Sequence, residues 1–443
     1  MKELFRWTLF LGLIPTTLFA QKNAVPQQPE TRTAPRVEPV RPGFFNGPDA
    51  PRLLGDYSGW QSTLARKGIT FTGYWTGIAS GNPIGGAKQG HITTVDDTFI
   101  VANLDLGRMA HIKKAGLQMS FIDRGGHGLS NEYIQGQYNV QQCVGGQSPF
   151  FYQMFFQQEL GAGKVLYKAG RLSASDDMNA SPLYSLYLNN GIDGDIRNIL
   201  FDTQSSAYPF PTWGGYLRYQ ISKRFYMKNA VFQTTKNVFD PGLHGVDWGV
   251  HDGDSIITMH ELAWTPEIVQ SKGSERTTLP GHYWLGSTYS PWTGFTQFLS
   301  TKTVGNSYGF YVHGDQMLWR RSSTSNAGLT LWTAAAYYPQ QNVSIVPVQI
   351  NVGLVDQGRF GHRSEDKTIF GFIYGQFSRD YAKSIVAKGN GNPSHEMVVE
   401  LAHRIQIARH TFVQPDLQVD IRPAGTGHIP TAVVPGMEIG IVF

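Results

Sequence analysis

Two short stretches of the chain contain charged residues of the kinds that bind or transform polar ligands. The stretch GRLSASDD contains Arg171, Asp176 and Asp177, and the stretch FIDRGG contains Arg124. Two neighbouring carboxyl groups can serve as acid and base in the hydrolysis of glycosides. A planar guanidinium can instead hold two hydroxyl groups in a fixed fork geometry. The residues alone therefore leave open both catalysis and the binding of a polyhydroxylated ligand.

Histidine and cysteine give no sign of a catalytic or metal site. The thirteen His residues are dispersed, and in HEMVVELAH the second His follows the first by eight positions. This spacing differs from the H-E-x-x-H motif of zinc enzymes. The single cysteine, Cys143, excludes an internal disulfide. The sequence therefore predicts a protein that is not an enzyme, and it implies no metal ion and no cofactor.

The composition favours an all-β protein with polar but mostly uncharged surfaces. Charged residues make up 16% of the chain and hydrophobic residues 41%, both below the usual share of a soluble domain. Glycine (50 residues) and aromatic residues (13%) are abundant instead. Such residues suit twisted strands joined by tight turns. The net charge of +4 is scattered, without a Lys/Arg run, so nucleic acid is not a predicted partner.

The N-terminal region predicts export followed by a tether. Lys2 and Arg6 flank an apolar stretch that ends at Ala20, so residues 1–20 are interpreted as a signal peptide, with a short membrane anchor as the alternative. Residues 21–51 contain seven prolines and are interpreted as a disordered tether. A short helix is predicted near residues 58–67, capped by Ser58 and stopped by Gly68.

From about Thr70 onward, apolar and polar residues alternate with the period of a β-strand. In TFVQPDLQVDIRP, Val413, Leu417 and Val419 alternate with Gln and Asp residues, and HEMVVELAHRIQIARH is similar. We count roughly sixteen or seventeen such segments, many of about ten residues. A soluble sandwich also alternates, but its strands are shorter and its buried face is apolar. Residues 52–443 are therefore predicted to form a closed antiparallel β-barrel that spans a membrane.

Aromatic residues and long connections support a barrel with a narrowed pore. Trp319, Trp332, Tyr337 and Tyr338 are predicted to lie at strand ends, at the membrane interface. The connections near residues 125–150 and 173–213 are much longer than the turn after Arg409. We expect long loops on one rim, tight turns on the other, and a pore narrowed by any long loop that folds inward.

The chain ends in an alternating strand, PGMEIGIVF. Met437, Ile439, Ile441 and Phe443 are predicted to face lipid, and Glu438 is predicted to face the lumen. This strand must pair with the first one to close the barrel. A terminal Phe on such a strand also resembles the signal that is read by the outer-membrane assembly machinery, so deletion of Phe443 is expected to impair assembly.

Several blocks resemble the carbohydrate-selective porin family of the OprB type. They are LLGDYSGWQSTLARKGITFTGYWTGIASGNPIGG, FIDRGGHGLSNEYIQ, KVLYKAGRLSASDDM and ELAHRIQIARHTFVQPDLQVDIRPAG. The resemblance extends from about residue 53 to the end of the chain. It implies a sixteen-stranded barrel in the outer membrane of a Gram-negative bacterium, through which small sugars diffuse passively.

A channel for sugars needs charged side chains to replace water at the hydroxyl groups and aromatic faces for the C–H patches. Alternation places Arg124 on the face of Gln118 and Ser120, which favours the lumen. Arg171 is predicted to point outward unless it lies beyond the membrane or past a bulge at Gly170. Arg124 and Arg171 resemble the arginines of two family blocks. The residues predicted to line the constriction are Arg124, Glu159, Arg171, Asp176 and Asp177.

The predicted partners are small sugars, outer-membrane lipid and lipopolysaccharide, and the assembly machinery through Phe443. Two alternatives stay open at this point. One is a secreted, soluble all-β protein that binds carbohydrate. The other is a general diffusion porin without sugar preference.

Overall fold

The computed structural model describes residues 51–443 except 144–147, 245–247, 273–274 and 323–324. The signal peptide of residues 1–20 and nearly all of the tether of residues 21–51 lie outside the described residues. The helices are α1 (Trp60–Arg66), α2 (Leu106–Ala110), α3 (Ala174–Asp177), α4 (Arg197–Thr203) and α5 (Arg379–Ala387). Single turns of other helix types are η2 (Ser130–Ile134), η3 (Tyr184–Leu186), η4 (Pro241–His244) and η5 (Pro423–Gly425).

Strands make up most of the described chain. The strands of the first half are β1 (Ile69–Gly81), β2 (Ile92–Asp105), β3 (Ala115–Gly126), β4 (Pro149–Leu160), β5 (Val165–Leu172), β6 (Thr212–Gln220), β7 (Phe225–Thr234), β8 (Ser255–Trp264) and β9 (Glu267–Lys272). Those of the second half are β10 (Glu275–Ser290), β11 (Phe295–Thr296), β12 (Thr303–Val304), β13 (Ser307–Arg320), β14 (Gly328–Tyr337), β15 (Val348–Gln357), β16 (Lys367–Gln376), β17 (His395–Ala408), β18 (Thr411–Ile421) and β19 (Ala432–Val442).

One antiparallel sheet closes on itself. β1 pairs with β2 on one edge and with β19 on the other, where Tyr74 lies opposite Val442. The sheet contains seventeen strand segments, but β8 and β9 follow one another along the chain and both pair with β10. They therefore count as one strand of the wall, and the barrel has sixteen strands. β11 and β12 form a separate hairpin. The prediction of a closed sixteen-stranded antiparallel barrel is confirmed.

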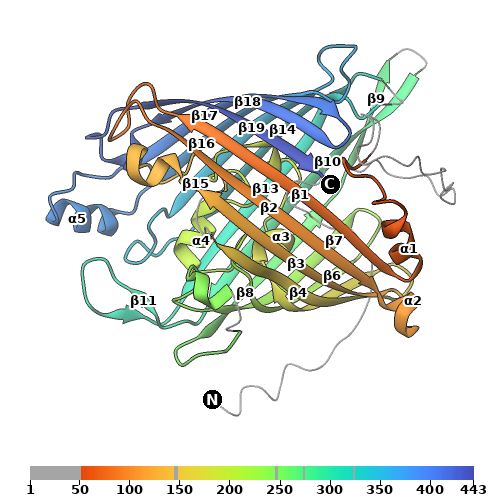
Figure 1. Ribbon diagram of the computed structural model, residues 1–443. Coiled ribbons are helices and arrows are strands. Elements are labelled where there is room, and N and C mark those ends of the chain that lie inside the picture. The colour runs from red at the N-terminus through yellow and green to blue at the C-terminus, as the bar shows by residue number, and fades with distance from the viewer. Residues whose placement is uncertain (1–50, 144–147, 245–247, 273–274, 323–324) are drawn as a thin grey trace.

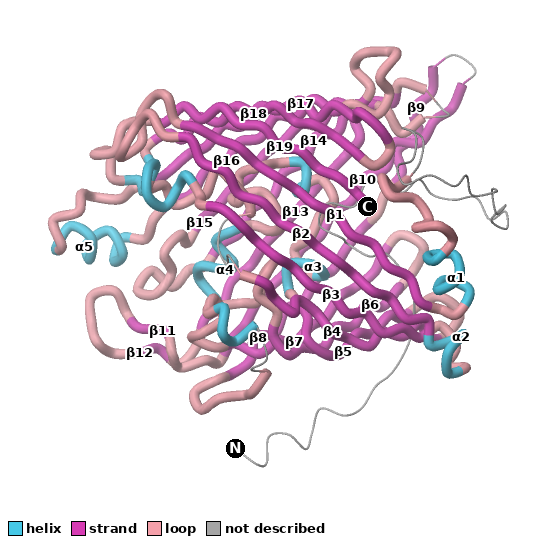
Figure 2. The backbone as a smooth tube through the Cα atoms, viewed as in Figure 1, coloured by secondary structure: helices cyan, strands magenta, loops and turns pink. Residues whose placement is uncertain are grey.

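The two ends of the barrel differ in the length of their connections. Figure 1 shows α1 and α2 at one end, and α5 with the β11–β12 hairpin at the opposite end. Figure 2 shows more extensive loops at the second end. We call these the short-turn end and the long-loop end. In outer-membrane barrels the short turns face the periplasm and the longer loops face the outside.

The outer face of the strands carries an exposed apolar belt. Its residues alternate with buried ones and include Ile100, Phe121, Leu262, Leu285, Phe310, Leu331, Ile350, Phe370, Leu401, Leu417 and Met437. An outward apolar band on a closed barrel is the surface that hydrocarbon requires. No helix in the described part of the chain is long and apolar enough to cross a membrane.

The inner face of the last three strands is polar, as the alternation predicts. Its buried side chains include Glu396, Glu400, Arg404, Gln414, Asp416, Gln418, Asp420 and Glu438. Met437 is 47% exposed, whereas its neighbour Glu438 is fully buried. The predicted outward and inward sides of the C-terminal strand are therefore confirmed.

Two predictions about aromatic residues are wrong. Trp332 and Tyr338 are fully buried inside the barrel and do not lie at the membrane interface. The indole N–H of Trp332 donates a hydrogen bond to the Tyr187 hydroxyl at 3.0 Å. A loop inside the barrel supplies this partner, so the ring can pack on the inner face.

The cap of the first helix also differs from the prediction. Gly59, with φ of 88°, occupies the N-cap of α1 and makes no side-chain cap bond. The carboxylate of Asp56 accepts the backbone N–H of Ser62 at 2.6 Å instead. Ser58 adopts a positive φ of 59° and is not the cap.

Candidate functional site

Two long connections fold into the barrel. The first inner loop, residues 127–143, follows β3, and the second inner loop, residues 173–211, joins β5 to β6. Figure 1 shows α3 and α4 of the second inner loop within the ring of strands. The largest buried hydrophobic cluster joins this loop to the inner face of the wall. The expected narrowing of the lumen by long loops is therefore present.

Carboxylates of β17 hold both inner loops by their backbone. The Glu400 carboxylate accepts the N–H groups of Leu188 and Asn189 at 2.6 and 3.2 Å. The Glu396 carboxylate accepts two consecutive N–H groups of the first inner loop at 2.8 and 3.0 Å. Buried N–H groups need such acceptors because water cannot reach them. These two acids therefore stabilise the loops that narrow the lumen.

Arg124 lies on the inner face of β3 in a fixed orientation. Its Nε donates to Oδ2 of Asp97 at 3.1 Å, and the Tyr208 hydroxyl donates to the same oxygen at 2.6 Å. The guanidinium carbon lies 4.7 Å from the centre of the Tyr208 ring. A guanidinium over an aromatic face keeps its plane fixed by a cation–π contact. The inward direction predicted for Arg124 is confirmed.

The second inner loop brings further charges towards this wall. Arg197, the first residue of α4, interacts electrostatically with Asp195, Arg124 and Asp193. Asp193 also interacts with Arg404 of β17. The lumen therefore contains three guanidinium groups linked by shared electrostatic neighbours.

Arg404 extends this set towards the barrel seam. Its Nη2 forms an ion pair with the Glu438 carboxylate at 3.0 Å, and its Nε donates to Gln414 at 2.5 Å. The guanidinium carbon lies 4.0 Å from the centre of the Phe412 ring. Arg124 and Arg404 thus share one arrangement, in which a guanidinium pairs with a carboxylate and rests on an aromatic face.

Asp176 and Asp177 lie at the end of α3, inside the barrel. The Asp176 carboxylate accepts hydrogen bonds from the Tyr152 hydroxyl at 2.6 Å and from the Gln153 amide at 2.9 Å. Asp177 forms an ion pair with Lys168 at 2.6 Å. The two neighbouring acids therefore have different partners, and Asp176 is the more exposed of the two.

Arg171 lies at the long-loop end of β5. It pairs in register with Met154 and Trp213, and Trp213 is 37% exposed on the outer side. Arg171 itself is only 1% exposed, because the connection between β7 and β8 covers it. Its guanidinium donates to backbone carbonyls at 3.1 and 3.4 Å and faces the Trp248 ring at 5.4 Å.

Glu159 lies near the opposite end of the barrel. Its carboxylate forms an ion pair with Lys114, which precedes β3, at 2.5 Å. The Lys114 side chain is about half exposed. The five residues predicted to line the constriction are thus distributed along the barrel. Arg124, Asp176 and Asp177 lie where the inner loops contact the barrel wall, which we call the inner-loop region.

Burial determines the charge of two loop side chains. Cys143 packs with Ile78, Val95 and Leu188, and desolvation raises the pKa of its thiol. Desolvation lowers the pKa of His244 to about 4. At neutral pH both groups are therefore uncharged. Within the described ranges, no group of three or more His, Cys, Asp or Glu side chains could hold a metal ion.

A family model described as Carbohydrate-selective porin, OprB family, matches residues 89–443. The chain belongs to this family. It is 24% identical to Porin B of Pseudomonas aeruginosa, over 89% of this chain and 92% of that protein.

Solved structures of the OprB family have the same fold. The high pH structure of Pseudomonas putida OprB is 23% identical, matches 91% of this chain and 100% of its own, and has a TM-score of 0.82. The low pH structure of the same protein is 20% identical, matches 90% and 100%, and has a TM-score of 0.59. The barrel is therefore an outer-membrane porin fold.

Residues of the OprB-family lumen that the sequence did not single out come mainly from the second inner loop. Arg197, Asp193 and Asp195 lie in a connection without alternation, so no sequence signal placed them in the lumen. Arg404 and Glu438 did carry a signal, because both lie on the polar side of alternating strands. Alternation shows which residues of a strand face the lumen. It does not show where along the strand the inner loops contact the wall.

Proposed function

We propose that this OprB-family porin lets small neutral sugars diffuse passively across the outer membrane, with Arg124 in the selective part of the lumen. The observation that carries this proposal is the Arg124 guanidinium, fixed between the Asp97 carboxylate and the Tyr208 ring. A guanidinium can replace water at sugar hydroxyls through its planar N–H groups, and an aromatic ring suits the C–H side of a sugar.

The balance of charges supports transport of a neutral solute. Arg124 is paired with Asp97, Arg404 with Glu438, and Lys168 with Asp177. Paired charges polarise hydroxyl groups but do not retain an ion strongly. Transport also requires binding that is weak enough for release.

The proposal assigns a different role to each of the other predicted site residues. Asp176 contacts sugar hydroxyls together with Arg124, and Asp177 positions Lys168 through their ion pair. Arg171 orders the long-loop end through its backbone contacts. Glu159 acts at the short-turn end, beside Lys114.

We also infer how the chain reaches its membrane. Residues 1–20 direct export, and residues 21–51 form a tether in the periplasm. The apolar belt contacts outer-membrane lipid and lipopolysaccharide, and the terminal strand with Phe443 is recognised by the assembly machinery. The charged groups of the lumen serve solute passage, and the protein catalyses no reaction.

Replacement of Arg124 tests the proposal. Sugar block of the ion current in planar bilayers should weaken about tenfold in Arg124→Ala, since hydrogen bonds to charged groups contribute about 1.5–3 kcal/mol. Arg124→Lys should recover only part of the block, because an ammonium lacks the planar fork. Arg276→Ala, on the exposed extension of β10, is the matched control. Unchanged block in Arg124→Ala, or wild-type channels that sugars never block, would instead indicate a general diffusion porin.

A further inference from the structure

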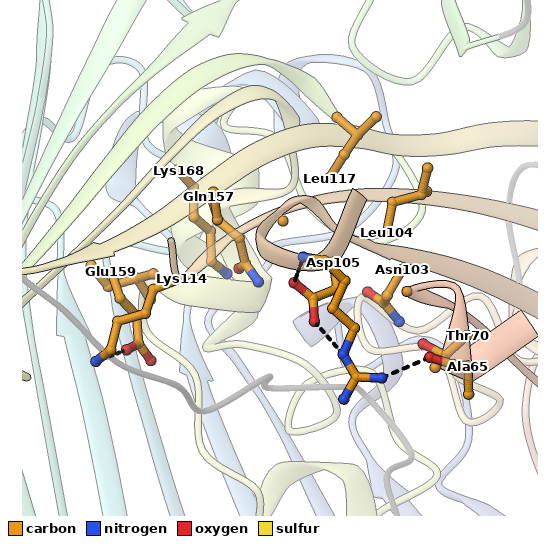
Figure 3. Close-up of a pocket in the computed structure, with 15 residues that line it drawn as sticks. Ala65, Thr70, Asn103, Leu104, Asp105, Lys114, Leu117, Gln157, Glu159 and Lys168 are labelled. Atoms are coloured by element: carbon orange, nitrogen blue, oxygen red, sulfur yellow. Dashed lines mark hydrogen bonds and ion pairs between the residues drawn. The ribbon is translucent and has the colours of Figure 1, made fainter. Parts of the chain in front are cut away.

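A cavity with both polar and apolar walls opens at the short-turn end. It has a volume of about 510 Å³ and is bordered by α1, by α2 and by the nearby ends of β1 to β5. This volume lies within the roughly 300–1,000 Å³ typical of small-molecule sites. We call it the mouth cavity. Figure 3 shows its polar side chains, with Leu104 and Leu117 pointing away from them.

The charged side chains of the mouth cavity are already paired. Lys114 and Glu159 form an ion pair at 2.5 Å, and Arg108 and Asp105 form another at 3.2 Å. The remaining cation, Lys168, is paired with Asp177 of the second inner loop at 2.6 Å. No unbalanced charge therefore favours an anion or a cation over a neutral ligand.

Three neutral side chains of the same cavity remain available. Thr70, Asn103 and Gln157 line it, and none of the three side chains makes a hydrogen bond to another described residue. Asn103 and Gln157 are half-buried, and Figure 3 shows them on either side of Asp105. Two amides and one hydroxyl offer both donors and acceptors, which is the pattern that a polyhydroxylated ligand needs.

Lys168 connects this cavity to the inner-loop region. Lys168 lines the cavity, and its ammonium group binds Asp177, the neighbour of Asp176. Asn103 and Gln157 line the same cavity as Lys168. Apolar groups such as Leu166 and Ala65 complete the lining and suit the C–H face of a sugar ring.

We propose that the mouth cavity is a second sugar-binding subsite, which receives a neutral mono- or disaccharide at the periplasmic exit of the pore. The inference rests on the proposed function, because it assigns a further site on the path of the same solute. The subsite binds through the uncommitted amides of Asn103 and Gln157, whereas the Arg124 region binds through charged groups.

The test is block of the ion current by glucose added at the short-turn side of oriented channels. In the double variant Asn103→Ala/Gln157→Leu, the block constant should weaken about tenfold, as expected for the loss of two neutral hydrogen bonds. Gln158→Leu is the matched control, because Gln158 is the next residue on β4 and does not line the cavity. Heat-dependent mobility on gels verifies that each variant forms a barrel.

The outcomes separate this inference from the proposed function. Glucose block that is lost in Arg124→Ala but unchanged in the double variant would overturn the second subsite only. Wild-type channels that glucose never blocks would overturn both. Gluconate and glucosamine provide a further criterion, since tighter block by either charged analogue at the mouth would contradict the charge balance of the cavity.

Discussion

The inner-loop region and the mouth cavity contain similar polar side chains that are used in different ways. In the inner-loop region, carboxylates such as Glu400 and Glu396 are fully buried and accept backbone N–H groups of the inner loops. In the mouth cavity, the amides of Asn103 and Gln157 are accessible and make no bonds within the described chain. The first set builds the shape of the lumen, and the second is available to a solute.

The difference shows that residue type alone does not identify a binding group in a polar barrel. A buried acid whose oxygens already accept hydrogen bonds cannot offer them to a ligand without leaving a loop N–H unpaired. A half-buried amide can replace its hydrogen bond to water by one to a sugar hydroxyl with little change in free energy. Hydrogen bonding within the chain therefore distinguishes Glu396 and Glu400, which hold the inner loops, from Asn103 and Gln157, which can bind a ligand.

Deletion of Phe443 is expected to have the largest effect, because a chain that does not assemble has neither the inner-loop region nor the mouth cavity. The Phe443 ring packs on β1, where a Cβ on Gly73 would lie 2.4 Å from it, and the backbones of the two residues pair. Deletion of Phe443 should reduce the amount of heat-modifiable barrel in the outer membrane severalfold, measured by fractionation and gel mobility. Phe360→Ala, in a short turn, is the control. Normal assembly of the deletion variant would refute a role for the terminal residue.

A more selective change should disturb only the inner-loop region. Glu400→Ala leaves the N–H groups of Leu188 and Asn189 without their acceptor, at a cost of about 1–3 kcal/mol for each buried group. We expect the second inner loop to loosen, single-channel conductance to rise and trisaccharides to enter in liposome swelling. Leu401→Ala, on the outer face of the same strand, should change neither. Identical conductance in Glu400→Ala would contradict the structural role of the acid.

The smallest expected effect is a pH response at the long-loop end. His244 donates from Nε2 to the Val238 carbonyl at 2.6 Å, and its Nδ1 faces Arg171 at 3.5 Å. The negative charge of Asp240 acts to raise the pKa of His244. Desolvation lowers the pKa of His244 to about 4, from an ordinary value of about 6.5. In a loop detached from the wall, His244 has its ordinary pKa and binds a proton more readily than in the folded loop. The folded loop therefore loses stability as pH falls from about 6.5 towards 4.

The measurement for His244 is open-channel noise as a function of pH. Noise should increase below about pH 6 in the wild type, and His244→Gln should remove that dependence, since glutamine does not titrate in this range. An identical pH profile in both proteins would rule out His244 as the source. The glucose block at the mouth should be insensitive to His244→Gln, which keeps the two regions separate.

Much of the barrel could be predicted from the sequence because membrane strands obey a strict local rule. Alternation placed Glu438 inside and Met437 outside, and both faces are as predicted. The same rule fixed the inward direction of Arg124. It also predicted an outward direction for Arg171, and its register with Met154 and Trp213 agrees, although a covering loop buries the side chain.

Other features depended on contacts between distant segments. Trp332 was assigned to the membrane interface, yet it packs against Tyr187 of the second inner loop. Asp193 and Arg197 lie in that same loop, where no periodicity constrains the direction of a side chain. The mouth cavity likewise combines α1 with strands that are far apart in the sequence.

The sequence by itself therefore determined the barrel, its apolar outer face, its family and the side of the wall on which strand residues such as Arg124, Met437 and Glu438 lie. These properties follow from the two-residue period of a strand between lipid and water. Only the tertiary structure decided which lumen residues hold the inner loops and which remain available to a sugar. That division depends on where each loop meets the wall, because a hydrogen bond needs its partner within about 3 Å.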